Sequence, residues 1–238
     1  MPNRCYVLGI IVALMLAVGA RAADEPKTGA IFNGKDLAGL KACVKDQKNN
    51  WKVVSSVKLD PAADTKLIGD GAGGQPDSIL LNTANGTDLA TEKRYGDCEV
   101  HAEFMLAKKS DSGLFLHGLY QLQINDSFGL PDNKMSEGEC GGIMWTSKPK
   151  TNACLAPGQW QTVDIVFRAP RFDDKGKKTA KAKFVKVTLN GKVIQENIDV
   201  DEPTGGGLEE PESPTGPLVI QGIEGTVAYR NLRLTTRP

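Results

Sequence analysis

Apolar and polar residues alternate along most of the chain, a pattern typical of β-strands that are buried on one face. In the segment 97–106 every second residue from Cys98 to Leu106 is apolar, while Glu99, His101 and Glu103 lie between them. The segment 160–168 alternates in the same way, and the segments 184–189 and 193–200 are joined by an Asn-Gly pair, a strong hairpin signal. No stretch shows convincing helical spacing of apolar residues, so the pattern predicts an all-β sandwich or jelly roll.

Shorter segments with strand-like composition fill the rest of the chain and are separated by stretches rich in Gly, Pro and Asp. The residues 30–40 are expected to form an edge strand or strap, and the charged segment 173–181 a turn. Further strands are predicted at 51–59, 66–68, 79–81, 140–145, 218–221 and 226–235. The segment after position 22 is long enough for one large β domain, so we expect a single domain over 23–238.

The segment 110–126 is predicted to form a hairpin, with strands at 113–117 and 120–125 that meet at Gly118. Gln121 and Gln123 share a face of the second strand with Asn125, opposite Leu122. Amides donate and accept hydrogen bonds in fixed directions, which suits sugar hydroxyls. The alternative is a solvated sheet face, and the hairpin by itself leaves both interpretations open.

The first 22 residues are typical of an export signal. Arg4 precedes an apolar run at 6–18 that is too short to span a membrane, and Ala20-Arg21-Ala22 gives a small-x-small cleavage pattern. We therefore expect an exported protein, periplasmic or extracellular, that is not held in the membrane once the signal is removed. Lys+Arg and Asp+Glu balance at 29 each, with no basic stretch rich in aromatics, which argues against a nucleic-acid partner.

Four cysteines follow the predicted signal, in a compartment where disulfides can persist. Cys140 and Cys154 are the nearest in sequence and bracket a loop, so this pairing is favoured, with Cys43–Cys98 second. In the chain-entropy model, closing a loop of this length is worth about 3 kcal/mol. A Cys/His zinc site is a poor alternative because the chain has no Cys-x-x-Cys pair and only two His.

Several motifs, taken together, resemble one family, the 3-keto-disaccharide hydrolase domain, which has a concanavalin-like jelly-roll fold. They run in order from about residue 30 to the end of the chain. The matching segments are 32–37 (Phe-Asn-Gly-Lys-Asp-Leu), 95–104, 112–113 leading into 118–127 (Gly-Leu-Tyr-Gln-Leu-Gln-Ile-Asn-Asp-Ser), 139–143, 152–154, 157–162, 167–173, 190–191 and 229–232.

The resemblance implies cleavage of glycosides whose sugar carries a ketone at carbon 3, on the concave face of a curved double sheet. Such a ketone acidifies the hydrogen on carbon 2, so a base can remove it while an acid protonates the departing oxygen on carbon 1. The chain departs from the family's usual pattern at Gln121, where Glu is common, and at Gly222 and Ile223, where Asp and His are common. A lectin-like carbohydrate-binding module without turnover is therefore the alternative function, and an envelope interaction domain is a third.

Three residues are candidates for catalysis, and for each of them a purely structural role is the alternative. Asp126 ends the family motif of the second hairpin strand, although Asp also initiates turns. Glu103 lies on the polar side of its strand, where it could act as acid or base or form an ion pair. His117 could act as a base near neutral pH or serve as a hydrogen-bonded structural residue.

The candidates for substrate binding are Gln121, Gln123, Glu139, Arg168 and Gln221. Trp145 and Trp160 could stack on a sugar ring, but Trp in a sandwich strand is usually part of the core. No cofactor is clearly required. A divalent metal held by Asp126, Glu139 and His117 is conceivable, but their spacing matches no recognised pattern.

Overall fold

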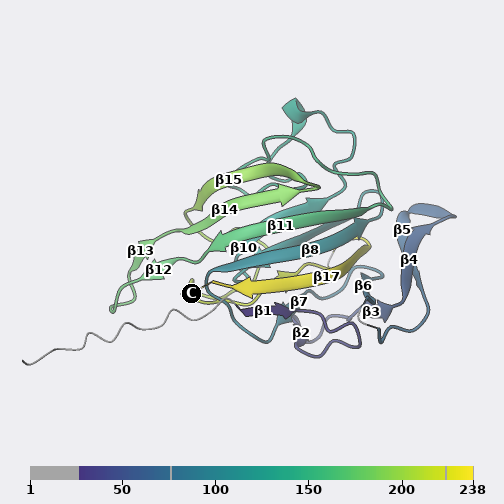
Figure 1. Ribbon diagram of the computed structural model, residues 1–238, viewed down its shortest axis with the longest axis horizontal. Helices are drawn as coiled ribbons and strands as arrows, with labels where there is room; N and C mark the ends of the chain where they lie inside the picture. Colours follow the sequence, from purple (N-terminus) through teal and green to yellow (C-terminus); the bar gives the residue numbers. More distant parts are fainter. Residues whose placement is uncertain (1–26, 76, 223, 238) are drawn as a thin grey trace, which may run out of the picture.

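The structure, a computed structural model, describes residues 27–75, 77–222 and 224–237. Two antiparallel sheets face each other, and in Figure 1 the larger sheet lies in front with the smaller one behind it. The predicted export signal at 1–22 lies outside the described residues. Among the residues that are described, no helix is both long and apolar enough to cross a membrane.

The larger sheet has eight strands in the order β15-β14-β11-β8-β17-β6-β3, and β1 pairs with the end of β17. β17 (Val227–Thr236) bonds to β8 along one edge and to both β6 and β1 along the other. The remaining strands are β1 (Lys27–Ala30), β3 (Trp51–Val54), β6 (Ile79–Asn82), β8 (Cys98–Leu106), β11 (Trp160–Arg168), β14 (Ala182–Leu189) and β15 (Lys192–Val200).

The smaller sheet has five strands in the order β10-β9-β16-β7-β2. They are β2 (Leu40–Ala42), β7 (Leu89–Thr91), β9 (Asp111–Leu116), β10 (Tyr120–Asn125) and β16 (Val219–Ile220). Two hairpins stand outside both sheets, β4 (Ser56–Asp60) with β5 (Ala63–Asp70) and β12 (Arg171–Phe172) with β13 (Lys178–Ala180). The short 3-10 helix η1 (Asp132–Lys134) lies in the loop after β10.

The core fills the space between the two sheets with every second side chain of each strand. Phe104 of β8 and Tyr229 of β17 enter it from the larger sheet, and Leu114 of β9 and Leu122 of β10 enter it from the smaller one, all with 0% exposure. This arrangement confirms the predicted all-β concanavalin-like jelly-roll sandwich. The side chains between the core positions form the two outer faces of the molecule.

The predicted strands are mostly present, with several differences. The predicted strand at 51–59 is divided into β3 and β4, which belong to different sheets, and the residues 31–39 form bends and turns in place of an edge strand. The residues 140–145 do not form a strand, because only Ile143 bridges to Leu122 before the chain turns away. The charged segment 173–181 is not a plain turn, since it contributes β13 of a small hairpin. β7 was not predicted, because three residues are too few to show an alternation.

Candidate functional site

The outer face of the smaller sheet carries a row of amide side chains. Gln121 and Gln123 lie on β10 with Leu122 between them, and because neighbouring residues of a strand point to opposite faces, both amides are on the outer side. Gln221 follows β16 and joins the same face, since its backbone N–H donates to the carbonyl of Gly113 at 2.9 Å. We call Gln121, Gln123 and Gln221 the amide cluster.

Gly113 of β9 leaves room for the Gln121 side chain, which reaches across β9 to the other amides of the cluster. A Cβ at this position would lie 2.6 Å from Nε2 of Gln121, so the Gln121 side chain occupies the space that any other residue would fill. From there Nε2 donates to Oε1 of Gln123 at 2.8 Å and to Oε1 of Gln221 at 3.1 Å. The three amides are at least 91% buried, so their geometry is fixed before any ligand arrives.

Asp111 extends the cluster on β9 and accepts from Nε2 of Gln123 at 3.0 Å and 3.2 Å through its two carboxylate oxygens. Its backbone bridges to Glu224, and its cross-strand partner on β10 is Asn125. Burial, together with the Glu224 carboxylate, raises the pKa of Asp111 to about 6. Asp111 can therefore exchange a proton in a pH range where most carboxyl groups are fully ionised.

Asp88 is a second carboxyl group on this face, at the start of β7. Leu89 faces the core and is paired with Ile220, so the alternation places Asp88 beside Gln221 on the outer side. Burial raises the pKa of Asp88 to about 6, although the Gly222 N–H, 2.7 Å from Oδ1, favours the charged form. Asp88 lines a cavity of about 410 Å³, together with Cys43, Gln47 and Leu208.

Glu139 lies near the same end of the sheet as Asp111 and contributes to its electrostatics. Its Oε2 accepts from the Ser127 hydroxyl at 2.6 Å, and the amide of Asn125 donates to the Gly138 carbonyl at 2.8 Å. Of the predicted binding residues, the structure therefore brings Gln121, Gln123 and Gln221 together and holds Glu139 in the loop beside them.

Asp126 lies outside this arrangement. Its Oδ2 accepts from the backbone N–H of Lys109 at 3.0 Å and its Oδ1 from Phe128 at 3.4 Å, so the side chain stabilises two turns. It borders a different cavity of about 370 Å³, which is also lined by Lys108 and Phe128. These two backbone hydrogen bonds are those expected of an Asp that initiates a turn at the end of a strand.

Glu103 and Arg168 belong to the outer face of the other sheet. Glu103 accepts from Nε of Arg230 at 2.7 Å and from Nδ2 of Asn231 at 2.5 Å, which is the ion-pair alternative. Arg168 ends β11 with an exposed side chain. Because the core separates the two sheets, neither residue can act on a ligand that is bound at the amide cluster.

His117 is 4% exposed and packs edge-on against Phe167, with 5.2 Å between ring centroids. β9 ends one residue earlier, and the positive φ of 58° turns His117 away from the face of Phe115. Burial lowers the pKa of the imidazole, which favours the neutral form. His117 is therefore packed against the aromatic core, and little of its imidazole is accessible to solvent.

The four predicted disulfide cysteines are free thiols in the structure. Cys140 and Cys154 are in contact, and their mutual hydrogen bond raises the pKa of Cys140 and lowers that of Cys154. Cys43 packs against the outer cluster of Phe115, whereas Cys98 lies in the main core. The structure therefore contradicts a Cys43–Cys98 bridge and places the favoured pair side by side.

The residues considered for a metal are apart from one another: His117 packs in the core, Asp126 holds turns and Glu139 bonds to Ser127. Across the described part of the chain, no group of three or more His, Cys, Asp or Glu side chains has an arrangement that could hold a metal ion.

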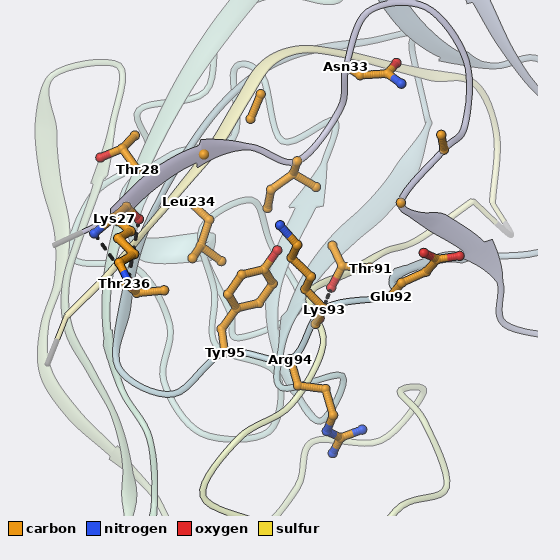
Figure 2. A pocket seen from close by; sticks show the side chains of 15 residues that line it. Lys27, Thr28, Asn33, Thr91, Glu92, Lys93, Arg94, Tyr95, Leu234 and Thr236 are labelled. Atoms are coloured by element: carbon orange, nitrogen blue, oxygen red, sulfur yellow. Dashed lines mark hydrogen bonds between the residues drawn. The ribbon is translucent and has the colours of Figure 1, made fainter. Parts of the chain in front are cut away.

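A cavity of about 640 Å³ lies elsewhere, between β1 and the segment 91–95. Figure 2 shows Tyr95 and Leu234 lining it, while Arg94 points away toward its ion pair with Glu210. None of the residues predicted from the sequence for catalysis or binding lines this cavity.

Sequence reasoning missed Asp88 and Asp111, the two carboxyl groups that flank the amide cluster. Asp111 could have been found, because a hairpin centred on 117–119 pairs it with Asn125 and puts it on the face of Gln123. Asp88 had no comparable signal, since it precedes a strand of three residues and follows an Asn-Gly turn.

Two crystal structures from Parabacteroides distasonis ATCC 8503, both provisionally described as glycosyl hydrolases, have the same fold. The first is 23% identical with a TM-score of 0.61, and the match covers 87% of this chain and 82% of the other. The second is 16% identical with a TM-score of 0.55, over 89% of this chain and 94% of the other. No protein of curated function matches the chain. The family described as the 3-keto-alpha-glucoside-1,2-lyase-like domain matches residues 27–235, and the chain belongs to this family.

Proposed function

We propose that the protein cleaves 3-keto-glycosides by removing the carbon-2 hydrogen and expelling the group on carbon 1. One observation carries this proposal: Asp88 and Asp111, both with a pKa raised to about 6, share one sheet face with the amide cluster. Titratable groups with shifted pKa values are frequent in active sites, because proton transfer requires a group that gains and loses protons near the working pH. Family membership supports the same chemistry.

Asp88 is the base in this proposal, because it lines a cavity of about 410 Å³ that can receive a sugar ring. Its carboxylate takes the proton from carbon 2, and the electron pair of that bond forms an enolate with the carbon-3 ketone. The enolate then expels the carbon-1 oxygen, which takes a proton from the Asp111 carboxylic acid. The products are the free leaving group and an unsaturated ketone, to which water can add later.

The amide cluster provides the donor for the enolate oxygen. Oε1 of Gln221 accepts from Gln121, and its Nε2 makes no hydrogen bond within the described part of the chain. That amide can therefore donate to a ligand that lies beside Gln221, between the two carboxyl groups. A donor that is already oriented stabilises developing negative charge without reorganisation. Gln121 cannot act as a base, because an amide takes up no proton at neutral pH.

The test is release of a chromogenic aglycone from a 3-keto-glucoside by the purified protein, with and without a chelator. We expect release by the wild type and loss of at least a hundredfold in Asp88→Asn. Asp111→Asn should lose far less with this substrate than with a 3-keto-disaccharide, because an aryl oxide leaves without an acid. Asp126→Asn discriminates between sites: full activity supports the outer sheet face, while abolished activity would move the chemistry to the Asp126 cavity.

A carbohydrate-binding module without turnover is the second candidate, favoured by the three amides, whose carbonyls and N–H groups suit hydroxyl recognition. The same assay separates the two functions. Saturable binding of the 3-keto-glucoside with no chromophore release, in wild type and variants alike, would establish the module and reject the enzyme.

We also propose export, supported by the sequence pattern at residues 4–22. Amino-terminal sequencing of the protein recovered from a bacterial periplasm tests this proposal. The expected first residue is Ala23 or Asp24, and an intact chain confined to the cytoplasm would contradict it.

A further inference from the structure

A series of three hydrogen bonds runs from the core of the sandwich to the carboxyl group of Asp88. It begins at Tyr229 of β17, whose hydroxyl lies 2.8 Å from Oγ of Ser112 on β9. Oγ of Ser112 donates to the carbonyl of Gln221 at 2.7 Å. The N–H of the same peptide group, which belongs to Gly222, donates to Oδ1 of Asp88 at 2.7 Å. We call this series the hydrogen-bond chain.

The chemistry of the groups fixes the direction of each bond in the hydrogen-bond chain. A carbonyl oxygen only accepts, so the single hydroxyl hydrogen of Ser112 points to Gln221. Oγ of Ser112 then offers only lone pairs to Tyr229, whose hydroxyl must be the donor of that bond. All three donors therefore point toward Asp88. Hydrogen bonds that are arranged head to tail in this way polarise and strengthen one another.

The first two members of the hydrogen-bond chain lie in the core between the two sheets. Ser112 and Tyr229 are both 0% exposed, although a core position normally carries an apolar side chain. The ring of Tyr229 packs against Trp51 and Phe104, with 6.3 Å and 6.5 Å between ring centroids. A low-dielectric interior strengthens the bond between the two hydroxyls. The larger sheet is thus linked through the core to a peptide group on the face of the smaller sheet.

The Gln221–Gly222 peptide joins two groups of the proposed site. The side chain of Gln221 belongs to the amide cluster, and the N–H of Gly222 binds Asp88. The peptide is also held from the other side, since the Gly222 carbonyl accepts from Nδ2 of Asn82 at 2.7 Å. A Cβ at Gly222 would lie 2.8 Å from Nε1 of Trp51, so the backbone packs closely on the indole. A peptide group held this firmly transmits a change in the donor at its carbonyl to the acceptor at its N–H.

We propose that Ser112 and Tyr229 are positioning residues that act on Asp88 from inside the core, through the Gln221–Gly222 peptide. This inference rests on the proposed function, in which Asp88 is the base. Ser112 polarises the peptide, so that its N–H binds the ionised carboxylate more strongly, and Tyr229 strengthens the donation by Ser112. Neither residue touches the substrate or takes part in proton transfer.

Other titratable groups face Asp88 from the elements packed around it. Cys43, which follows β2, and Glu209 line the same cavity as Asp88. Lys41 of β2 acts on the Cys43 thiol, and Asp111 of β9 lies on the same face of the sheet. All of these groups are retained in the variants described below, so a difference between two variants reports the hydrogen-bond chain.

Titration of the Asp88 carboxyl group without any substrate tests the inference. Burial raises the pKa of Asp88 and the Gly222 N–H lowers it, so a weaker N–H donor should raise the pKa further. Carbon-13 NMR of protein labelled at the aspartate carboxyl carbons follows the group, and Asp88→Asn assigns its signal. Ser112→Ala should raise the pKa of Asp88 by about 0.3 units or more, and Tyr229→Phe should raise it by a smaller amount.

The double variant separates a connected chain from two independent structural effects. In the Ser112→Ala background, Tyr229→Phe should cause no further change in the pKa of Asp88, because the chain is already interrupted. Two unconnected effects on packing would add instead. Tyr229→Phe keeps the ring in the core, so it tests the chain by itself where the alanine variant fails to fold.

Ser110→Ala and Tyr120→Phe are the matched controls, since each removes a buried hydroxyl of the same kind. The hydroxyl of Ser110 accepts from the Thr226 N–H at 3.2 Å, and that of Tyr120 donates to Glu212 at 2.5 Å. Neither bond leads to Asp88, so both controls should leave its pKa within about 0.1 units of the wild-type value.

An unchanged pKa of Asp88 in Ser112→Ala or Tyr229→Phe, additive shifts in the double variant, or equal shifts in the controls would overturn the inference. In the chromogenic assay, the acidic limb of the pH profile of kcat/KM should move by the same amount as the NMR titration. The titration is independent of turnover. A shift seen by NMR in a protein that releases no chromophore would therefore reject the proposed cleavage and leave the hydrogen-bond chain established.

Discussion

The carboxamide of Gln121 lies over Gly113 of the adjacent strand and donates to Oε1 of Gln221 at 3.1 Å. This contact joins β10 to the end of β16 across β9, and it exists only because residue 113 has no side chain. The amide cluster is thus a consequence of one glycine in a strand, a position where glycine is otherwise unfavourable.

Gly113→Ala should displace the Gln121 amide and break its bonds to Gln123 and Gln221. A Cβ would lie 2.6 Å from Nε2, and the displaced amide would be left partly unsatisfied in a buried site. We expect a loss of about 1–3 kcal/mol in the free energy of unfolding, measured by urea denaturation, together with a large loss of 3-keto-glucoside cleavage. Gly29→Ala is the control, because no atom lies within 4 Å of its added Cβ; an equally mild effect at both positions would contradict this account.

The sequence was sufficient for the fold and for part of the site. Alternation at 97–106 and 160–168 predicted β8 and β11 to within a residue, because each strand is long and buried on one side. The outward direction of Gln121 and Gln123 followed from the same rule. His117 did not follow it, since a positive φ at the strand end reverses the side chain, and the sequence alone does not show that conformation.

The rest of the site depends on contacts between distant segments. Asp88 reaches the amide cluster because β7 pairs with β16, more than 120 residues later, and no local pattern specifies that pairing. Asp126 was a catalytic candidate because the family motif ends on it; its carboxylate accepts from the backbone N–H groups of Lys109 and Phe128, contacts that the sequence pattern does not show. Trp145 was considered either as a stacking residue for a sugar ring or as a core residue of a strand; its segment is not a strand, and its side chain is 71% exposed.

Asp88 and Asp111 should make the free energy of unfolding depend on pH. Their pKa is raised to about 6 in the folded protein, above the value of about 4 for an unfolded chain. Between these values the folded state holds more protons, so ionising the two groups lowers the free energy of unfolding as the pH rises. The double variant Asp88→Asn/Asp111→Asn should therefore gain stability relative to the wild type between pH 4 and pH 7. Urea midpoints measured across this range check the direction; a constant difference would contradict the raised pKa values.

The thiols of Cys140 and Cys154 are in contact, so we predict that they form a disulfide when the protein is purified from an oxidising compartment. Thiol titration of the unfolded, unreduced mature protein should detect two free thiols, Cys43 and Cys98, in place of four. Peptide mass spectrometry should identify the 140–154 bridge, and reduction should lower the free energy of unfolding by about 3 kcal/mol. Four free thiols in the periplasmic protein, or a bridge to Cys43, would contradict the prediction.

The strain at Trp145 predicts an order of stability among its variants. Trp145→Gly and Trp145→Ala both remove the ring, but glycine adopts the positive φ of 59° without steric cost. The glycine variant should therefore be more stable than the alanine variant by about 1 kcal/mol, measured by thermal or urea denaturation. Greater stability of the alanine variant would show that the loop relaxes and that no strain is held there.

Exchange of the carbon-2 hydrogen tests the central claim most directly, because it isolates proton removal from bond cleavage. The substrate is 3-keto-1,5-anhydroglucitol, which has no leaving group, dissolved in deuterium oxide. Proton NMR follows the signal of the carbon-2 hydrogen, and the hydrogen on carbon 4, on the other side of the ketone, serves as the internal reference. The proposal predicts that the wild-type protein removes the carbon-2 signal selectively and that Asp88→Asn does not. No catalysed exchange by the wild type, or equal exchange by Asp88→Asn, would contradict the assignment of Asp88 as the base.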